Sequence, residues 1–237
     1  MYYFETVGHR GAPMEAPENT LLSFRRAIAI GADWIEFDLR ESRDGILVVI
    51  HDDTVDRMTN GKGKVRDMTF KELRTLDAGN GQKIPSLGQV IRLAKGRVKM
   101  DIEIKERGIE EDVLQAIKRS GIMGQCMVSS FFYDSIKKVK ELSPEAMTAA
   151  IMGRMPRDVE KRLDTLFNDV NTRTLMVRKT IALEPFVGEA RRLGFRVGIW
   201  NADTPAEIGR FAAMDPSYLC SNYPERLVEF KQMHAIV

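Results

Sequence analysis

Residues 34–40 read WIEFDLR and residues 98–105 read VKMDIEIK, and these two stretches decide the fold. Apolar and charged residues alternate in both, which is the period of a β-strand, so each strand has one apolar and one charged face. Carboxylates on one charged face lie about 7 Å apart, the length of a two-residue repeat. The charged faces carry Glu36, Asp38 and Arg40 in the first stretch, and Lys99, Asp101, Glu103 and Lys105 in the second.

Alternation of this kind has two interpretations. In antiparallel strands the polar face meets water, whereas in a parallel barrel both faces are covered and interior charges need a partner. The rest of the chain favours the barrel, because short apolar runs rich in β-branched and aromatic residues alternate with segments of helical period. We expect strands near residues 5–9, 34–40, 46–51, 98–105, 126–130, 147–152, 174–178, 196–201 and 218–221, and helices near 19–30, 86–95, 109–119, 132–141, 157–169, 182–193, 205–213 and 224–232.

This count is about what the eight βα units of a TIM (β/α)8 barrel require, and 237 residues fit one such domain. A doubly wound open sheet fits less well, since it usually has fewer strands and no GxGxxG occurs. Pro17 and Asn19, Ser86 and Pro224 are the predicted helix starts. Residues 52–85 break the rhythm with turn signals, one short helix and little core-forming sequence. We therefore predict one α/β domain over residues 1–237, with a small insertion at about 52–85, after the second barrel strand, that caps the site.

Composition excludes several classes of protein. Hydrophobic residues make up 43% and charged residues 30% of the chain, as in ordinary folded proteins. The net charge of +2 is a small difference between 36 basic and 34 acidic residues, so no global field favours nucleic acid or a membrane surface. No window approaches the ~20 apolar residues of a membrane span, and the N-terminus lacks a leader pattern, so we expect a cytoplasmic protein without stable membrane insertion. Oligomeric state stays open.

Two of the three histidines occupy similar places in the sequence. His9 in VGHRG and His51 in LVVIHDD each end an apolar run that looks like a barrel strand. The carboxyl ends of barrel strands face the active site, where two imidazoles can act as general base and general acid near neutral pH. His234 is expected to be structural. Cys126 and Cys220 lie far apart in apolar runs, as buried structural thiols do.

Charged residues complete a candidate site. Three buried carboxylates are suited to a hard cation. Arg10 offers a planar fork for a phosphate and Lys105 a point charge, although either residue also fits a structural ion pair with Glu36 or Asp38. Carboxylates, a cation, two histidines and two basic side chains together indicate phosphate-ester cleavage. No serine nucleophile motif or P-loop competes with this interpretation.

These residues stand in a recognisable pattern. The segment HRGAPMEAPENTLLSFRRAIAIGADWIEFDLRESRDGILVVIHDDTVDRMTNGKGKV resembles the N-terminal signature of glycerophosphodiester phosphodiesterases. The resemblance continues through KIPSLGQVI, the EIK of MDIEIKE, the SSF of VSSFFYD, GIW near residue 200 and SNYPERL near the end, whereas residues 145–180 show only the barrel rhythm.

The resemblance implies a TIM-barrel hydrolase that splits deacylated phospholipids into sn-glycerol 3-phosphate and an alcohol such as choline or ethanolamine. It implies His9 and His51 as the catalytic acid/base pair, with His9 favoured as base and His51 as acid. Glu36, Asp38 and Glu103 would bind Mg²⁺ or Ca²⁺. Arg10 and Lys105 would bind the phosphate, and Trp200 would wall the pocket or belong to the core.

Two features leave specificity open. Asn201, Ala202 and Asp203 stand where the family commonly has Thr, an apolar residue and Asn, so hydrogen bonding on that side of the pocket is undecided. Residues 155–180 carry no familiar motif, so the leaving alcohol is undecided too.

Two other functions compete. A lysophospholipase D-like enzyme needs an apolar entry surface, for which the mostly polar insertion offers only Val55, Met58, Val65, Met68 and Phe70. A non-catalytic barrel that binds a phosphodiester would be indicated by the loss of a histidine or carboxylate, but every such position is filled.

Overall fold

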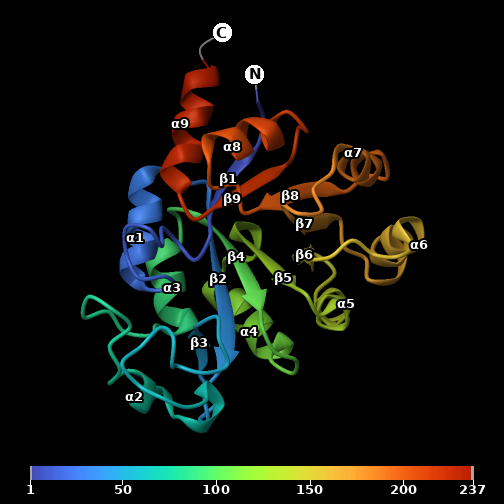
Figure 1. Ribbon diagram of the computed structural model, residues 1–237. Helices are drawn as coiled ribbons and strands as arrows, with labels where there is room; N and C mark the ends of the chain where they lie inside the picture. Colours follow the sequence, from blue (N-terminus) through green and yellow to red (C-terminus); the bar gives the residue numbers. More distant parts are fainter. Residues whose placement is uncertain (1, 236–237) are drawn as a thin grey trace.

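The chain forms a closed barrel of eight parallel strands with helices around it, as the computed structural model of residues 2–235 shows (Figure 1). The hydrogen-bonded order is β1-β9-β8-β7-β6-β5-β4-β2, and the β1–β2 pairing, with Val7 beside Trp34, closes the ring. This confirms the predicted TIM (β/α)8 barrel. The barrel strands are β1 (Glu5–Gly8), β2 (Trp34–Glu41), β4 (Lys99–Ile104), β5 (Cys126–Ser130), β6 (Met147–Met152), β7 (Thr174–Arg178), β8 (Arg196–Trp200) and β9 (Tyr218–Ser221).

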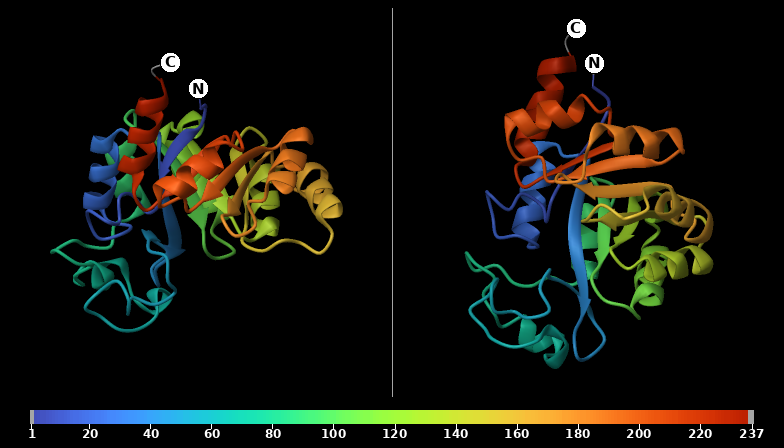
Figure 2. Two further views of the ribbon diagram at one scale, coloured as in Figure 1. Left: turned by 45° about the horizontal axis from the view of Figure 1, so that its top comes forward. Right: turned by 45° about the vertical axis from the view of Figure 1, so that its right-hand side comes forward.

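Helices cover the outer surface of the barrel, and both termini lie at the end of the molecule opposite the insertion (Figure 2). Within residues 2–235, no helix combines the length and the apolar character that crossing a bilayer requires. The helices outside the insertion are α1 (Leu21–Ile30), α3 (Leu87–Ala94), α4 (Glu110–Ser120), α5 (Tyr133–Leu142), α6 (Val159–Asp164), which continues as the π-helical turn η3 (Thr165–Asp169), α7 (Glu184–Arg192), α8 (Pro205–Ala212) and α9 (Pro224–Ala235), with a 3-10 turn η2 (Met123–Gln125) before β5.

The predicted helix starts are correct at Ser86 and Pro224 but not at Asn19. Ser86 is the N-cap of α3, and its backbone N–H donates to Gln89 Oε1 at 3.0 Å. Helix α1 is instead capped by Thr20, whose hydroxyl accepts from the Ser23 N–H. The amide of Asn19 is already engaged, because it donates to Asp38 Oδ2 at 2.8 Å inside the barrel.

The run that ends at His51 is not a barrel strand, which corrects the prediction. Strand β3 (Leu47–Val49) runs antiparallel to the end of β2, with Val48 paired to Arg40. Strand β2 extends beyond the barrel, and β3 is the return half of that hairpin. His51 therefore reaches the barrel mouth from the end of this hairpin and not from the carboxyl end of a parallel barrel strand.

The insertion has its own small core, which the sequence reading missed. It contains η1 (Val65–Asp67) and the short helix α2 (Phe70–Leu73), and it lies at the end of the barrel toward which the strands point (Figures 1 and 2). Its buried members pack on the hairpin: Val48, Ile50, Val55, Val65, Leu73 and Ile84. Val55 and Val65 are therefore unavailable as an apolar entry surface.

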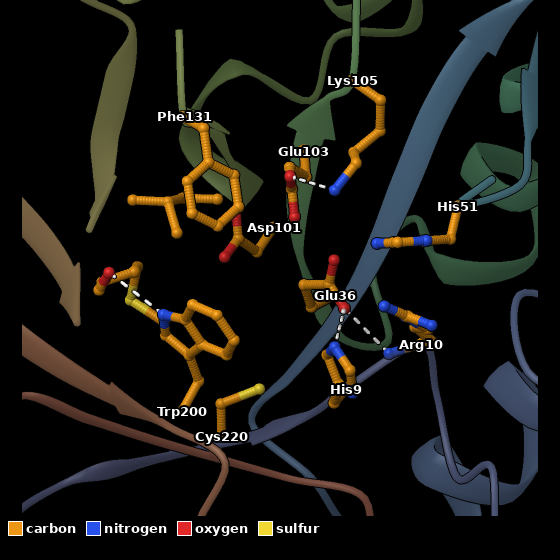
Figure 3. A pocket seen from close by; sticks show the side chains of 12 residues that line it. His9, Arg10, Glu36, His51, Asp101, Glu103, Lys105, Phe131, Trp200 and Cys220 are labelled. Atoms are coloured by element: carbon orange, nitrogen blue, oxygen red, sulfur yellow. Dashed lines mark hydrogen bonds and ion pairs between the residues drawn. The ribbon is translucent and has the colours of Figure 1, made fainter. Parts of the chain in front are cut away.

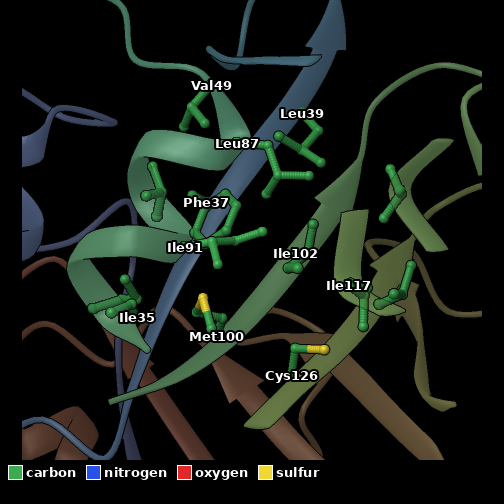
Figure 4. Packing of buried hydrophobic residues seen from close by; sticks show 14 of the residues in the cluster. Ile35, Phe37, Leu39, Val49, Leu87, Ile91, Met100, Ile102, Ile117 and Cys126 are labelled. Carbon is green, nitrogen blue, oxygen red and sulfur yellow. The ribbon is translucent and has the colours of Figure 1, made fainter. Parts of the chain in front are cut away.

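The main core packs the outward faces of β2 and β4 against α3 (Figure 4). Ile35, Phe37 and Ile102 are fully buried there beside Leu87 and Ile91. Full burial of each such side chain stabilises the fold by about 1.5–3 kcal/mol. The predicted apolar faces are thus the outer faces of the strands, and the charged faces point into the barrel.

Candidate active site

One pocket at the mouth of the barrel gathers almost every residue that the sequence singled out. Its lining includes His9, Arg10, Glu36, His51, Asp101, Glu103, Lys105, Phe131, Trp200 and Cys220 (Figure 3). Asp38, with 1% of its surface exposed, lies beside Glu36 and Glu103 and contacts Arg10 and Lys105.

The register of β2 on β4 builds the acidic centre of the pocket. Glu36 pairs with Asp101 and Asp38 pairs with Glu103, so two alternating strands place four buried carboxylates side by side. Burial and the neighbouring Asp38 raise the pKa of Glu103 to about 8. Burial also raises the pKa of Asp101 to about 7, although its carboxylate accepts a hydrogen bond from Ser129. The four carboxylates can carry more negative charge than the two neighbouring cations, Arg10 and Lys105, neutralise.

A divalent cation fits this cluster. Glu36, Asp38 and Glu103 each offer an oxygen, and these oxygens lie within 4.8 Å of one another. Glu36 Oε1 and Asp38 Oδ1 are buried without a hydrogen-bond partner among residues 2–235. Buried carboxylate oxygens of this kind are the ligands that Mg²⁺ and Ca²⁺ prefer, and a cation would offset the cost of burying Glu36 Oε1 without a partner and Asp38 Oδ1 with only Lys105 Nζ, at 3.5 Å.

A tight turn places His9 and Arg10 at the pocket. A Cβ on Gly8 would lie 2.4 Å from the Gly11 carbonyl oxygen, so the two backbones approach more closely than any side chain allows. Gly11 has a φ of +91° and Arg10 a φ of +54°. A left-handed conformation costs a non-glycine residue of order 1 kcal/mol, and such strain is common at functional sites. The Arg10 N–H in turn donates to Glu36 Oε2 at 2.9 Å.

The Asn222 amide oxygen orients the His9 ring, and the Asn201 amide lies beside the same nitrogen. Nδ1 lies 2.8 Å from Asn222 Oδ1 and 2.9 Å from Asn201 Nδ2, while Nε2 lies 4.0 Å from Glu36 Oε2. With the Nδ1 proton donated to Asn222, Nε2 is left with a free lone pair toward the pocket. Burial, followed by the charge of Arg10, lowers the pKa of His9 to about 4.

A chain of ion pairs orients His51. Its Nδ1 contacts Asp52 Oδ1 at 2.7 Å, and Arg57 Nε donates a hydrogen bond to Asp52 Oδ2 at 2.7 Å. Arg57 also contacts Glu18 at 2.9 Å, and Glu18 binds Arg10 at 2.8 Å. The Arg57 contact holds the pKa of Asp52 well below its usual range. Burial lowers the pKa of His51, and the carboxylates of Asp38 and Asp52 oppose that effect.

Arg10 and Lys105 are both ion-paired and accessible from the pocket. A structural ion pair and a role in phosphate binding, the two interpretations of these residues from the sequence, are therefore compatible. Arg10 Nε lies 3.3 Å from Asp38 Oδ2. Lys105 Nζ lies 2.7 Å from Glu103 and 3.5 Å from Asp38. Both line the pocket, so each cation has a carboxylate on one side and the cavity on the other. Such a cation is held in place for an anion without being buried.

Several residues that support this arrangement were missed from the sequence. They are Glu18, Asn19, Asp52, Arg57, Ser129 and Asn222, each of which holds one of the named side chains through contacts given above. Asp52 is the one that the sequence could most easily have indicated, because it follows His51 directly. The partners from distant elements leave no local pattern.

Residues 201–203, which differ from the residues common in the family, still form hydrogen bonds at the pocket. Asn201 contacts His9, and Asp203 accepts from the Asn222 side-chain amide and backbone N–H, both at 2.9 Å. Asp203 therefore fixes the amide that fixes His9. Hydrogen bonding on this side of the pocket is present, which answers the question that the sequence left open.

Trp200 walls the pocket opposite the histidines. Its indole N–H donates to the Met176 carbonyl at 3.1 Å, and its ring meets Phe131 edge-on at 6.0 Å. Cys126 and Cys220 are buried free thiols as predicted, and burial raises the pKa of Cys126 to about 12. His234 lies on α9 beside Phe230, outside the pocket.

Comparisons with known proteins place the chain in one family. The model described as the glycerophosphoryl diester phosphodiesterase family matches residues 9–226. The chain is 32% identical to the protein YhdW of Bacillus subtilis (strain 168) over 94% of this chain and 96% of the relative. It is 42% identical to a glycerophosphodiester phosphodiesterase of Caldanaerobacter subterraneus over 58% of this chain and 62% of the relative.

A solved structure adds a ligand in a similar protein. A phosphodiesterase of Oleispira antarctica, determined in complex with the product sn-glycerol-3-phosphate, superposes with a TM-score of 0.85 at 25% identity. The match covers 95% of each chain.

Proposed function

Since the chain belongs to the glycerophosphoryl diester phosphodiesterase family and is an enzyme of the phosphodiesterase class, we propose that it hydrolyses glycerophosphodiesters to sn-glycerol 3-phosphate and an alcohol. The observation that carries this proposal is the pocket itself. Four carboxylates, two cations and two separately oriented imidazoles meet at one end of the barrel. Glycerophosphocholine and glycerophosphoethanolamine are the first substrates to test.

The proposed chemistry begins with an internal attack. His9 takes the proton of the glycerol 2-hydroxyl, whose oxygen forms a bond to phosphorus. The bond from phosphorus to the leaving alcohol breaks, and His51 gives its proton to that oxygen. The resulting cyclic phosphate is then opened by water, with His51 taking the proton of the water and His9 returning its proton to the 2-oxygen. Protons and bonds balance over the two steps.

The other residues manage charge in this scheme. Arg10 and Lys105 face the phosphate oxygens as hydrogen-bond donors, and Trp200 shields one side from water. A divalent cation held by Glu36, Asp38 and Glu103 would supply further positive charge to the phosphate. Asn222 and Asp52 keep the two rings in the tautomers that the scheme requires.

The remaining expectations are part of the proposal. We take Mg²⁺ or Ca²⁺ as the ion, because the proposed ligands are all carboxylate oxygens. One domain over residues 1–237 with the insertion at about 52–85, a cytoplasmic location and the absence of nucleic-acid partners stay predictions from the sequence.

The lipid alternative loses support from the insertion. Val55 and Val65, two of the five residues of the predicted apolar patch, are buried in the small core of that segment, and Met58, Met68 and Phe70 are only partly exposed. A water-soluble substrate therefore fits better than a lysolipid.

The test measures release of glycerol 3-phosphate from glycerophosphocholine with and without EDTA, followed by addition of Mg²⁺ or Ca²⁺. We expect metal-dependent release, with little turnover of lysophosphatidylcholine in parallel. Turnover of the lysolipid alone would show that the enzyme is a lysophospholipase D-like phosphodiesterase and not a glycerophosphodiesterase. Inactivity on both with either metal would overturn the hydrolase assignment in favour of a binding protein.

A further inference from the structure

A second cleft adjoins the proposed active site on the side away from the histidines. It shares the lining residues Phe131, Ile151 and Trp200 with the first pocket, so the two pockets adjoin. In Figure 3, Phe131 and Trp200 lie across Glu36 and Glu103 from His51. The cleft has a volume of about 440 Å³, within the range of small-molecule sites. Its other lining residues are Tyr133, Met152, Gly153, Arg154 and Arg178.

The barrel places two arginines at this cleft. Met176 lines the active-site pocket, and Arg178 follows it on the same face of β7 by the two-residue period of a strand. Arg178 is the last residue of β7 and pairs with Trp200, the last residue of β8. Arg154 follows the end of β6 by two residues. Neighbouring strands thus deliver both side chains to the same rim.

Neither arginine has an acidic partner. Within residues 2–235, Arg154 and Arg178 form no ion pair, and they are the only charged residues that line the cleft. Lys179, next to Arg178, is in contrast bound to Glu207 at 2.8 Å. Both arginines are exposed, so each is free to meet a ligand.

The aromatic residues between the two pockets, Phe131 and Trp200, each already contact a cationic side chain. The Arg178 guanidinium lies 6.0 Å from the Trp200 ring centroid, and Lys105 Nζ lies 5.5 Å from the Phe131 centroid. Tryptophan and phenylalanine would otherwise suit a quaternary ammonium head such as choline. A third cation here would meet like charge at close range, whereas an anion would meet two unpaired guanidiniums.

We propose that this cleft binds the far end of the alcohol half of the substrate, while the ester oxygen of that alcohol stays in the first pocket with His51, and that the preferred alcohol carries a negative charge at this far end, as a second phosphate or a carboxylate. This inference rests on the proposed function, because the alcohol is what leaves the phosphorus there. Arg154 and Arg178 determine the specificity, and the catalytic steps are unchanged. The chain then prefers polyanionic glycerophosphodiesters to glycerophosphocholine.

The test compares initial rates on three substrates that share the glycerol 3-phosphate half. Glycerophosphocholine has a cationic alcohol, glycerophosphoglycerol a neutral one, and bis(glycerophosphoryl)glycerol an anionic one. We expect kcat/KM to be highest for the anionic alcohol and lowest for choline, after allowance for the two equivalent bonds of the bis compound. The advantage of the anionic alcohol should shrink with added salt, because exposed charges are screened.

Variants isolate the arginines. Arg154→Gln and Arg178→Gln should each lower the ratio of kcat/KM for the anionic over the neutral alcohol by about threefold, and the double variant by about tenfold, as exposed charge pairs do. Arg157→Gln is the matched control, since Arg157 is exposed on the same loop but does not line the cleft. It should leave the ratio unchanged.

The outcomes separate the two proposals. Turnover of all three substrates with a ratio that the double variant does not change would overturn the role of the cleft while leaving the hydrolase intact. A wild-type preference for glycerophosphocholine would overturn it as well. Inactivity on all three would overturn the proposed function and this inference together.

Discussion

The two imidazoles are held by unlike partners, which suits them to the unlike roles of the proposed chemistry. His9 contacts neutral amides and has 20% of its side chain exposed, whereas His51 contacts the carboxylate of Asp52 and has 33% exposed. A carboxylate partner favours the protonated ring more strongly than the neutral amide oxygen of Asn222 does, because it also carries a charge. The contacts therefore favour His51 as acid and His9 as base.

Removal of either ring should stop most of the chemistry without unfolding the protein. His9→Ala and His51→Ala are each expected to lower kcat by about 10²–10⁴, the span of general acid or base catalysis. Circular dichroism checks the fold of each variant. His234→Ala is the matched control, since that ring lies on α9 away from the pocket. Full activity in both active-site variants would exclude the two-histidine scheme.

Asp52→Asn tests the orienting role by its pH dependence. The Asp52 carboxylate raises the pKa of His51, so the amide should let that pKa fall. If His51 must be protonated to release the alcohol, the basic limb of the kcat profile moves to lower pH in the variant. Asp53→Asn, at the next position, is the control. An unmoved limb together with a lower kcat would mean that Asp52 acts on the structure alone.

At the scale of elements, the capping box of α8 anchors the loop that holds His9 in place. Thr204 Oγ1 accepts from the Glu207 N–H, and the Glu207 carboxylate accepts from the N–H groups of Thr204 and Asp203. Lys179 contacts the same carboxylate at 2.8 Å. Asp203 and Asn201 lie just before this cap, so the helix start and the site share one loop.

Loss of this cap should destabilise the fold by a measurable amount. Thr204→Ala is expected to lower the free energy of unfolding by about 1 kcal/mol in urea denaturation. Thr180→Ala is the control, because its hydroxyl makes no hydrogen bond in the part of the chain that the structure describes. Equal midpoints for the two variants would show that the box contributes nothing.

Glu207 also predicts a pH dependence. The Lys179 contact lowers the pKa of Glu207 to about 2, below the unfolded value near 4.3. The stabilisation is then present above about pH 4.3 and is lost as the pH falls towards 2. Wild type and Glu207→Gln should differ most in free energy of unfolding at pH 6, by less at pH 3, and should converge as the pH approaches 2. A constant difference across this range would contradict the ionic contribution.

At the scale of the whole molecule, the acidic cluster predicts that a divalent cation stabilises the barrel. The barrel closes around Glu36, Asp38, Asp101 and Glu103, so binding of a divalent cation should stabilise the folded state by mass action. At 100 times the Kd the gain is about 2.7 kcal/mol, which corresponds to a Tm rise of about 5–10 °C for a domain of this size.

Differential scanning fluorimetry with EDTA, Mg²⁺ or Ca²⁺ measures this rise. Glu103→Gln should reduce it, because one proposed ligand loses its charge. Glu106→Gln is the control, since Glu106 contacts Arg40 rather than the cluster. The same rise in Glu103→Gln as in wild type would place the ion elsewhere.

The sequence by itself determined which face of each strand is charged. Side-chain direction in a strand follows from the two-residue period, so Glu36 and Asp38 had to share a face with each other, as did Asp101 and Glu103. The βα rhythm likewise predicted the barrel, since elements of that period and number have few other ways to bury their apolar faces. Local periodicity is readable because it depends only on nearest neighbours along the chain.

Only the tertiary structure decided what these faces meet. The register that sets Glu36 beside Asp101, the hairpin that returns His51 to the mouth, and the chain from His51 through Arg57 to Arg10 all join residues distant in sequence. Such pairings are selected by the packing of the whole barrel, and no local pattern encodes them. For the same reason Arg154 and Arg178 acquire a shared cleft only when β6 and β7 lie side by side.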